Sequence, residues 1–164
     1  MVFTSSLEAF KNEARMLAKS LSVGMEATVI ALSGDLGAGK TTFAKEMAKA
    51  FDIEEGVTSP TFVIEKIYAC GRGPFRKLIH IDAYRLKDQS ELLALGWDQI
   101  VREKENLIIL EWPEHVAGLV PERAVRLRFS VLDGEAREVI RRGRVASHRF
   151  GCRFRGCRRR RSRD

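Results

Sequence analysis

The segment at residues 34–41, GDLGAGKT, constrains the fold of this chain most, because it fits the phosphate-loop pattern G-x-x-x-x-G-K-[ST]. Its three glycines can adopt backbone angles that a Cβ atom forbids, so successive amide groups can point at one anion. Lys40 can reach terminal phosphates, and Thr41 can offer its hydroxyl group to a magnesium ion. The segment therefore predicts a binding site for a nucleoside triphosphate.

The residues on either side of this loop support the prediction. Residues 27–33 form a continuous apolar, β-branched run, which is typical of a buried parallel strand. Residues 42–51 are expected to form a helix, since Phe43, Met47 and Ala50 recur at a spacing of three to four residues. Strand, glycine-rich loop and helix thus occur in the order that a phosphate loop requires.

The rest of the chain alternates between strand-like and helical segments. Residues 62–68 and 75–82 are predicted to form an antiparallel hairpin, and residues 107–111 a buried strand. Between them, Asp88 is expected to cap a helix with Glu91 three residues later, and the apolar face of that helix is formed by Leu92, Leu93 and Leu95.

The ends of the chain complete this outline. Residues 1–21 are a candidate amphipathic helix, and residues 125–131 and 137–141 are predicted to form a second hairpin. A chain of 164 residues suits one α/β domain, and neither an internal repeat nor a domain linker is visible.

The excess positive charge of the chain is confined to its end. The net charge is +7, but residues 141–164 contain eleven arginines and one acidic residue, so residues 1–140 carry a net charge of −3. Such a run is typical of a flexible tail that can contact RNA phosphates without specificity. We therefore expect a P-loop domain over residues 1–143 and a basic, disordered tail over residues 144–164.

Cysteine content and hydropathy narrow the class of protein further. Cys70, Cys152 and Cys157 do not form a disulfide framework, and Cys152, Cys157 and His148 offer too few ligands to favour a metal site. Cys70 is expected in the core or at its rim. No segment approaches the roughly 20 apolar residues of a membrane span, and no secretory signal is visible, so we expect a cytoplasmic protein that does not act at a membrane.

Two carboxylates follow apolar runs and are candidates for chemistry. A P-loop protein needs a carboxylate on a neighbouring strand to hold the magnesium shell or to polarise water. Glu111 is the candidate, because it follows the apolar run at residues 107–110. Asp82 ends another apolar strand, on which alternation places His80, Asp82 and Tyr84 on one face. Asp82 is a candidate for orienting the attacking water or for binding a magnesium-bound water, while the histidine alone is more often structural.

Four segments, taken in order, resemble the TsaE family, also called YjeE. They are GDLGAGKTT at residues 34–42, TSPTF at 58–62, HIDAYRL at 80–86 and LEWPE at 110–114. The resemblance covers about residues 5–140 and is far more specific than the phosphate loop alone. It implies an α/β fold of the P-loop NTPase type, with three layers, a central, mostly parallel sheet and additional antiparallel hairpins.

The resemblance also implies a function. Members of this family bind ATP and Mg2+, hydrolyse ATP slowly, and act with the TsaD and TsaB proteins. ATP turnover resets the complex that adds threonylcarbamoyladenosine to tRNAs reading ANN codons, so tRNA is an indirect partner.

The family motifs assign roles to individual residues of this chain. Lys40, Asp82 and Glu111 are implied to be catalytic, and Thr41 and Glu111 to coordinate magnesium. A loop containing Thr58, Ser59 and Thr61 is implied to act as a switch that senses the γ-phosphate. The residues implied to bind the nucleotide are Asp35, Leu36, Gly37, Ala38, Gly39, Lys40, Thr41, Thr42 and Trp112.

Two other functions remain open at this stage. The size and fold class also suit a small-molecule P-loop kinase, although no arginine-rich lid is visible. The basic tail alone suits an RNA-binding module whose nucleotide site is vestigial. Retention of ATPase activity and tRNA modification after deletion of residues 144–164 would exclude the second alternative.

Overall fold

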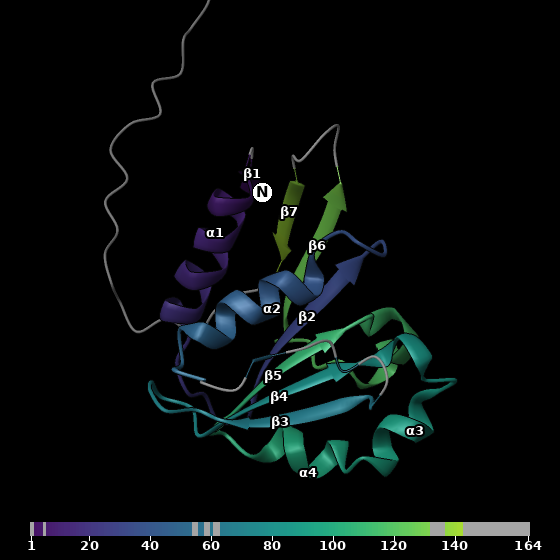
Figure 1. Cartoon of the computed structure of the whole chain (residues 1–164). Helices are drawn as coiled ribbons and strands as arrows, with labels where there is room; N and C mark the ends of the chain where they lie inside the picture. Colours follow the sequence, from purple (N-terminus) through teal and green to yellow (C-terminus); the bar gives the residue numbers. More distant parts are fainter. Residues whose placement is uncertain are drawn as a thin grey trace, which may run out of the picture.

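The structure is a computed structural model that describes residues 2–4, 6–53, 56–57, 60, 63–131 and 137–142. Seven strands form one sheet in the order β1-β7-β6-β2-β5-β4-β3 (Figure 1). The strands are β1 Val2–Thr4, β2 Thr28–Gly34, β3 Glu65–Ala69, β4 Lys77–Asp82, β5 Asn106–Glu111, β6 Val125–Val131 and β7 Arg137–Arg142.

The four central strands, β6, β2, β5 and β4, are parallel, and the outer pairs are antiparallel. The carboxyl ends of the central strands therefore meet at one edge of the sheet, where α/β proteins bind ligands. Both predicted hairpins, β3–β4 and β6–β7, are present, and the predicted buried strand is β5, in which every residue is buried.

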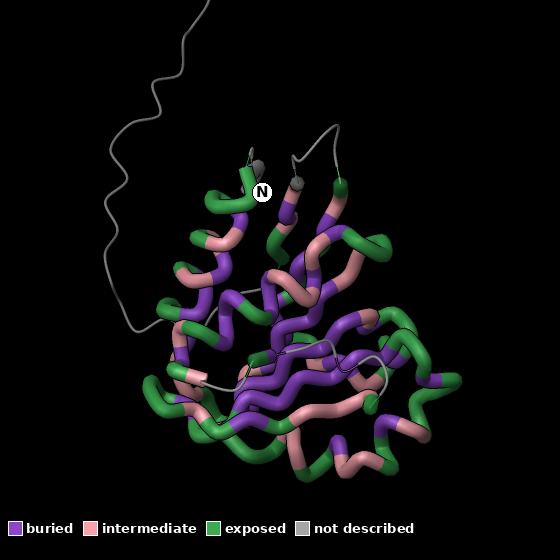
Figure 2. Tube along the Cα trace, viewed as in Figure 1, coloured by how far each residue is buried: buried purple, intermediate pink, exposed green. Residues whose placement is uncertain are grey.

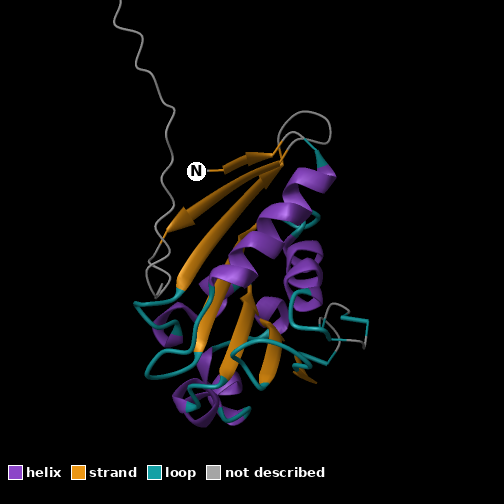
Figure 3. Ribbon diagram, turned by 90° about the vertical axis from the view of Figure 1, so that its left-hand side faces the viewer, coloured by secondary structure: helices purple, strands orange, loops and turns teal. Residues whose placement is uncertain are grey.

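Helices cover both faces of this sheet (Figure 3). One face packs against α1 and α2, and the other packs against α3, α4 and η2, which gives three layers. The α-helices are α1 Leu7–Ser20, α2 Lys40–Lys49, α3 Gln89–Ala94 and α4 Trp97–Arg102, and the 3-10 helices are η1 Ala83–Arg85 and η2 Pro113–Leu119.

Strand alternation explains the two cores. In β2, Ile30 and Leu32 point into the core beneath α1 and α2, while Val29 and Ala31 point into the core beneath α3, α4 and η2. The buried residues run through the middle of the sheet (Figure 2). Continuous apolar runs are thus required because these strands are buried on both faces.

The helix α2, which follows the phosphate loop, is fixed by packing and by charge. Phe43 of α2 meets Phe10 of α1 and Phe129 of β6 edge-to-face, with ring centroids 5.5 and 5.3 Å apart. The buried Glu46 carboxylate accepts hydrogen bonds from Arg15 of α1 at 2.9 and 3.2 Å and from Lys49 at 2.7 Å. These contacts hold α2 against α1 and β6.

Several boundaries differ from the expectations. The first residues pair as β1 with β7, and α1 begins only at Leu7, where Ser6 accepts a hydrogen bond from the Ala9 amide. The helix after the loop begins at Lys40, not at residue 42, because the loop itself supplies the first turn. In α3, Leu92 is buried but Leu93 is 41% exposed, so the buried face of this helix is narrower than the sequence predicts.

The predictions for the cysteines, the basic tail and membrane spans can be compared with the structure only in part. Cys70 is half-buried against the core, and burial raises the pKa of its thiol to about 11, as suits a core or rim residue. His148, Cys152, Cys157, the connection between the strands of the second hairpin and the tail from residue 144 lie outside the described residues. None of the helices in the described ranges has the length and apolar character of a membrane span.

Gly34 allows β2 to lie close to β6. Its φ is +129°, and a Cβ atom there would lie 2.3 Å from the Phe129 carbonyl oxygen, a backbone atom that cannot move aside. Gly34→Ala should therefore lower the free energy of unfolding by more than about 2 kcal/mol, measured by urea denaturation. The control is Gly24→Ala, where the nearest atom would be 3.6 Å away; equal losses for the two variants would contradict this account.

The Glu46 carboxylate should make stability depend on pH. Burial alone would raise its pKa, but hydrogen bonds from Lys49 and Arg15 outweigh burial and lower it below the ordinary value. A carboxyl group whose folded pKa is lowered stabilises the fold above its unfolded pKa and loses this effect as pH falls through the folded pKa. Glu46→Gln should thus cost about 1 kcal/mol at pH 7 and much less at pH 3, by urea denaturation. An equal cost at both pH values would show that the charge is irrelevant.

Candidate nucleotide-binding site

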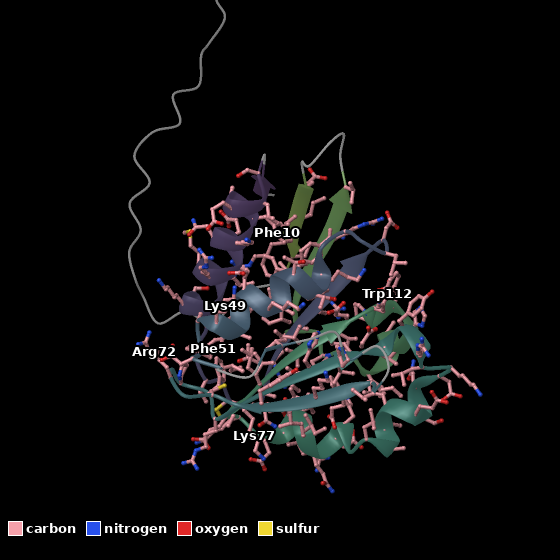
Figure 4. All side chains as sticks on the ribbon, in the orientation of Figure 1. Phe10, Lys49, Phe51, Arg72, Lys77 and Trp112 are labelled. Atoms are coloured by element: carbon pink, nitrogen blue, oxygen red, sulfur yellow. The ribbon has the colours of Figure 1, made fainter. Side chains whose placement is uncertain are left out.

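A pocket of about 240 Å³ lies at the carboxyl ends of the central strands, where the phosphate loop passes from β2 to α2. Figure 4 labels Trp112 at this edge of the molecule, whereas Arg72 lies at the opposite edge. The pocket is lined by Leu36, Gly37, Gly39, Lys40, Thr41, Thr42, Asp82, Tyr84, Glu111 and Trp112.

The loop has the backbone conformation that its glycines predict. Gly37 and Gly39 have φ angles of +79° and +102°, in the region that residues with a Cβ atom rarely adopt. Gly39 then caps α2, whose first-turn amide groups lack helical acceptors and carry the positive end of the helix dipole. Such a helix start is suited to hold an anion such as phosphate.

Lys40 is buried at the base of the pocket. Its Nζ atom donates hydrogen bonds to the carbonyl oxygens of Gly34 at 2.6 Å and Asp35 at 2.8 Å. It also lies 3.9 Å from the centroid of the Trp112 ring, in a cation–π contact. Burial lowers the pKa of the Lys40 ammonium group, and the charge of Glu111 opposes this shift.

Thr41 and Glu111 join the loop to the sheet. The Thr41 hydroxyl group lies 3.0 and 3.1 Å from the two carboxylate oxygens of Glu111, as a donor that both oxygens share. Glu111 is buried at the end of β5, and its Oε1 atom also lies 2.8 Å from Nε2 of His80 on β4. A hydroxyl and a carboxylate oxygen side by side are hard ligands of the kind Mg2+ prefers.

Asp82 lies beside Glu111 because of the strand register. β4 and β5 are parallel, with Asp82 opposite Glu111, so the two carboxylates end neighbouring strands at the same level. Asp82 is buried, and its Oδ1 atom accepts a hydrogen bond from the Tyr84 amide, which starts η1. Alternation on β4 therefore places His80 and Asp82 on one face as predicted, whereas Tyr84 lies beyond the strand, in η1.

An aromatic group closes one side of the pocket. The Trp112 ring lies 5.0 Å from the Tyr84 ring and 6.1 Å from the His115 ring, measured between centroids. Trp112 has a φ of +57°, which is uncommon for a residue with a bulky side chain. It adopts this angle where the chain turns sharply between β5 and η2. The turn directs the indole over Lys40.

The structure brings most of the sequence-predicted residues together at this pocket. Two of them do not line it: Asp35 contributes its carbonyl oxygen to Lys40, and the Ala38 side chain is buried in the core. The switch residues Thr58, Ser59 and Thr61 lie outside the described residues. Their role, like the catalytic and ligand roles of the others, stays a prediction.

Sequence reasoning missed three features of the site. It gave His80 no role, although its ring contacts the candidate metal ligand. It did not include Tyr84 or His115 among the residues around Trp112. The spacing H-x-D before a turn was the available signal for His80, since residues two apart on a strand share a face.

Comparisons with known proteins agree with the geometry. The family model described as "Threonylcarbamoyl adenosine biosynthesis protein TsaE" matches residues 4–139. A tRNA threonylcarbamoyladenosine biosynthesis protein TsaE of Streptomyces coelicolor is 37% identical over 131 residues, which cover 77% of this chain and 82% of that protein. The protein of the same name from Rickettsia prowazekii is 34% identical over 134 residues, covering 81% and 88%.

A solved structure extends the similarity to the fold. The crystal structure of Bacillus subtilis YdiB superposes with a TM-score of 0.64 at 28% sequence identity. The alignment covers 84% of this chain and 80% of that one. The mixed sheet with helices on both faces is thus shared with a solved protein.

The contact between Lys40 and Trp112 provides an optical test of the pocket. Phosphates at the loop would compete for the Lys40 ammonium group and move it relative to the indole, so an ATP analogue with Mg2+ should change tryptophan emission. The change should be absent in Trp112→Phe, in which the buried Trp97 is the remaining tryptophan. An equal change in both proteins would show that Trp112 does not sense the ligand.

Proposed function

The chain belongs to the TsaE family of threonylcarbamoyl adenosine biosynthesis proteins, and from this premise we propose that it is a magnesium-dependent ATPase acting in that pathway. The single observation that supports this most is the pair of hydrogen bonds between Thr41 and Glu111. They bring the phosphate loop and a strand-end carboxylate together as a P-loop ATPase requires.

ATP is proposed to bind with its phosphates in the loop. The amide groups around Gly37 and Gly39 and the first turn of α2 surround the anion, and Lys40 leaves the two carbonyl oxygens to pair with the terminal phosphates. Trp112 and Tyr84 line the same pocket, and the Trp112 ring lies over this ammonium group.

Thr41 and Glu111 are proposed to hold the magnesium ion. Both side chains offer hard oxygen ligands, and Glu111 is a buried carboxylate, which suits a cation at this point. The described residues contain no cluster of three or more His, Cys, Asp or Glu that would hold a metal ion alone. When bound, the ion would offset the negative charge that develops on the phosphate oxygens.

Asp82 is proposed to orient the attacking water. Its buried carboxylate lines the pocket beside Glu111, where it can accept a hydrogen bond from a water molecule directed at the γ-phosphorus. Attack of this water breaks the bond between the γ-phosphorus and the bridging oxygen, and the products are ADP and inorganic phosphate. The reaction is expected to be slow unless partner proteins complete the site.

The partners are proposed from the family. We expect the chain to act with TsaD and TsaB, and to affect tRNA through that complex. The residues of the proposed switch, Thr58, Ser59 and Thr61, would report the state of the nucleotide to these partners. The ATPase domain is proposed to end by residue 143, and the basic tail is expected to be peripheral to this function.

Lys40→Ala tests the proposal, because it removes the cation that faces the phosphates. ATP affinity should fall by about 100-fold or more, and a reconstituted system with TsaB and TsaD should no longer modify tRNA. Titration with a fluorescent ATP analogue and quantification of the modified nucleoside measure the two effects.

Lys45→Ala is the matched control, since Lys45 is exposed on the same helix and does not line the pocket. It removes one positive charge and should leave both activities unchanged. Normal tRNA modification by Lys40→Ala would contradict the proposed function.

A further inference from the structure

His80 is a fully buried imidazole with a single hydrogen bond in the described part of the chain. Its side chain has an exposure of 0%, its Nε2 atom lies 2.8 Å from Oε1 of Glu111, and its Nδ1 atom is buried without a partner. A buried polar atom without a partner costs stability, so an apolar residue would fill this position at lower cost. What the imidazole adds is its contact with Glu111.

The direction of this hydrogen bond follows from its chemistry. A carboxylate only accepts hydrogen bonds, so Nε2 of His80 carries the hydrogen and donates it to Glu111. In the neutral ring, Nδ1 is then an acceptor, and an unpaired buried acceptor is more often tolerated than an unpaired N–H group. The pair therefore has a defined donor and a defined acceptor.

The contact brings a second donor, from β4, to the Glu111 carboxylate. In the β4–β5 register, His80 lies opposite Ile109, so its ring reaches Glu111 diagonally along the sheet. The Thr41 hydroxyl group approaches the same carboxylate from the start of α2. Glu111 is thus held between a donor from the sheet and a donor from the loop.

We propose that His80 is a positioning residue: it orients the Glu111 carboxylate toward Thr41 and thereby sets the affinity of the site for magnesium. The inference rests on the proposed function of this site. Residues that donate a hydrogen bond to a metal ligand restrict its motion and set its basicity. The loss of such a residue typically lowers metal affinity. His80 is not among the described residues that line the nucleotide pocket.

Magnesium-dependent nucleotide binding tests this inference without requiring turnover. The measurement is the Mg2+ concentration that gives half of the full increase in affinity for a fluorescent ATP analogue, using the full chain. His80→Leu fills the space but cannot donate, and should raise this concentration about 10- to 100-fold. Affinity for the analogue without Mg2+ should stay as in the wild type.

Two variants separate positioning from a purely structural role. His80→Gln can place an N–H group near the position of Nε2, and should need clearly less Mg2+ than His80→Leu. Leu78→Val perturbs the same face of β4 without contact to Glu111, and should keep the wild-type Mg2+ dependence. If His80→Leu does not fold, His80→Asn replaces it, because its shorter amide does not reach the carboxylate.

A double-mutant cycle with Glu111→Gln completes the test. Once the carboxylate is absent, replacing His80 should have no further effect on Mg2+ dependence. Wild-type Mg2+ dependence in His80→Leu, or an equal loss of affinity with and without Mg2+, would overturn the inference. A wild-type protein that binds the analogue without any Mg2+ dependence would instead contradict the proposed function of the site.

Discussion

The contact between Thr41 and Glu111 is the interaction on which the organisation of the site depends. It links the first turn of α2 to the end of β5 through two residues that are 70 positions apart in sequence. A buried carboxylate is costly unless it is hydrogen-bonded or paired with a cation. The fold meets this requirement with Thr41 and His80, and a metal ion at the same point would meet it more fully.

The rest of the molecule holds Thr41 on α2 and Glu111 on β5 close to each other. β5 is buried along its whole length between parallel neighbours, so the position of Glu111 is fixed by the sheet. The helix α2 is fixed separately, by the edge-to-face contacts of Phe43 with α1 and β6 and by the ion pair between Glu46 and Arg15 of α1. A site that must keep its ligand-binding side chains in a defined geometry needs rigid elements to carry them, and β5 and α2 meet this need.

The sequence predicted the loop, its flanking strand and helix, both hairpins and the carboxylate at residue 111, because each depends on local pattern. It did not predict that Asp82 and Glu111 lie at the same level, since register arises from pairing between distant segments. The sequence predicts helix from residue 1, whereas Val2–Thr4 form the strand β1. A strand of three residues has too short a pattern to indicate that it pairs with a distant segment. Likewise, the role of His80 follows from a contact across strands, which the spacing within one strand cannot show.

A crystal structure with a non-hydrolysable ATP analogue and Mn2+ tests the central claim most directly, because Mn2+ takes the same hard oxygen ligands as Mg2+ and can be located by its anomalous scattering. The account predicts one strong anomalous peak between the phosphates and the Thr41 hydroxyl group, with the Glu111 carboxylate directed at it and Lys40 moved onto the terminal phosphates. A peak elsewhere, with Thr41 and Glu111 still hydrogen-bonded to each other and not directed at the metal ion, would contradict it.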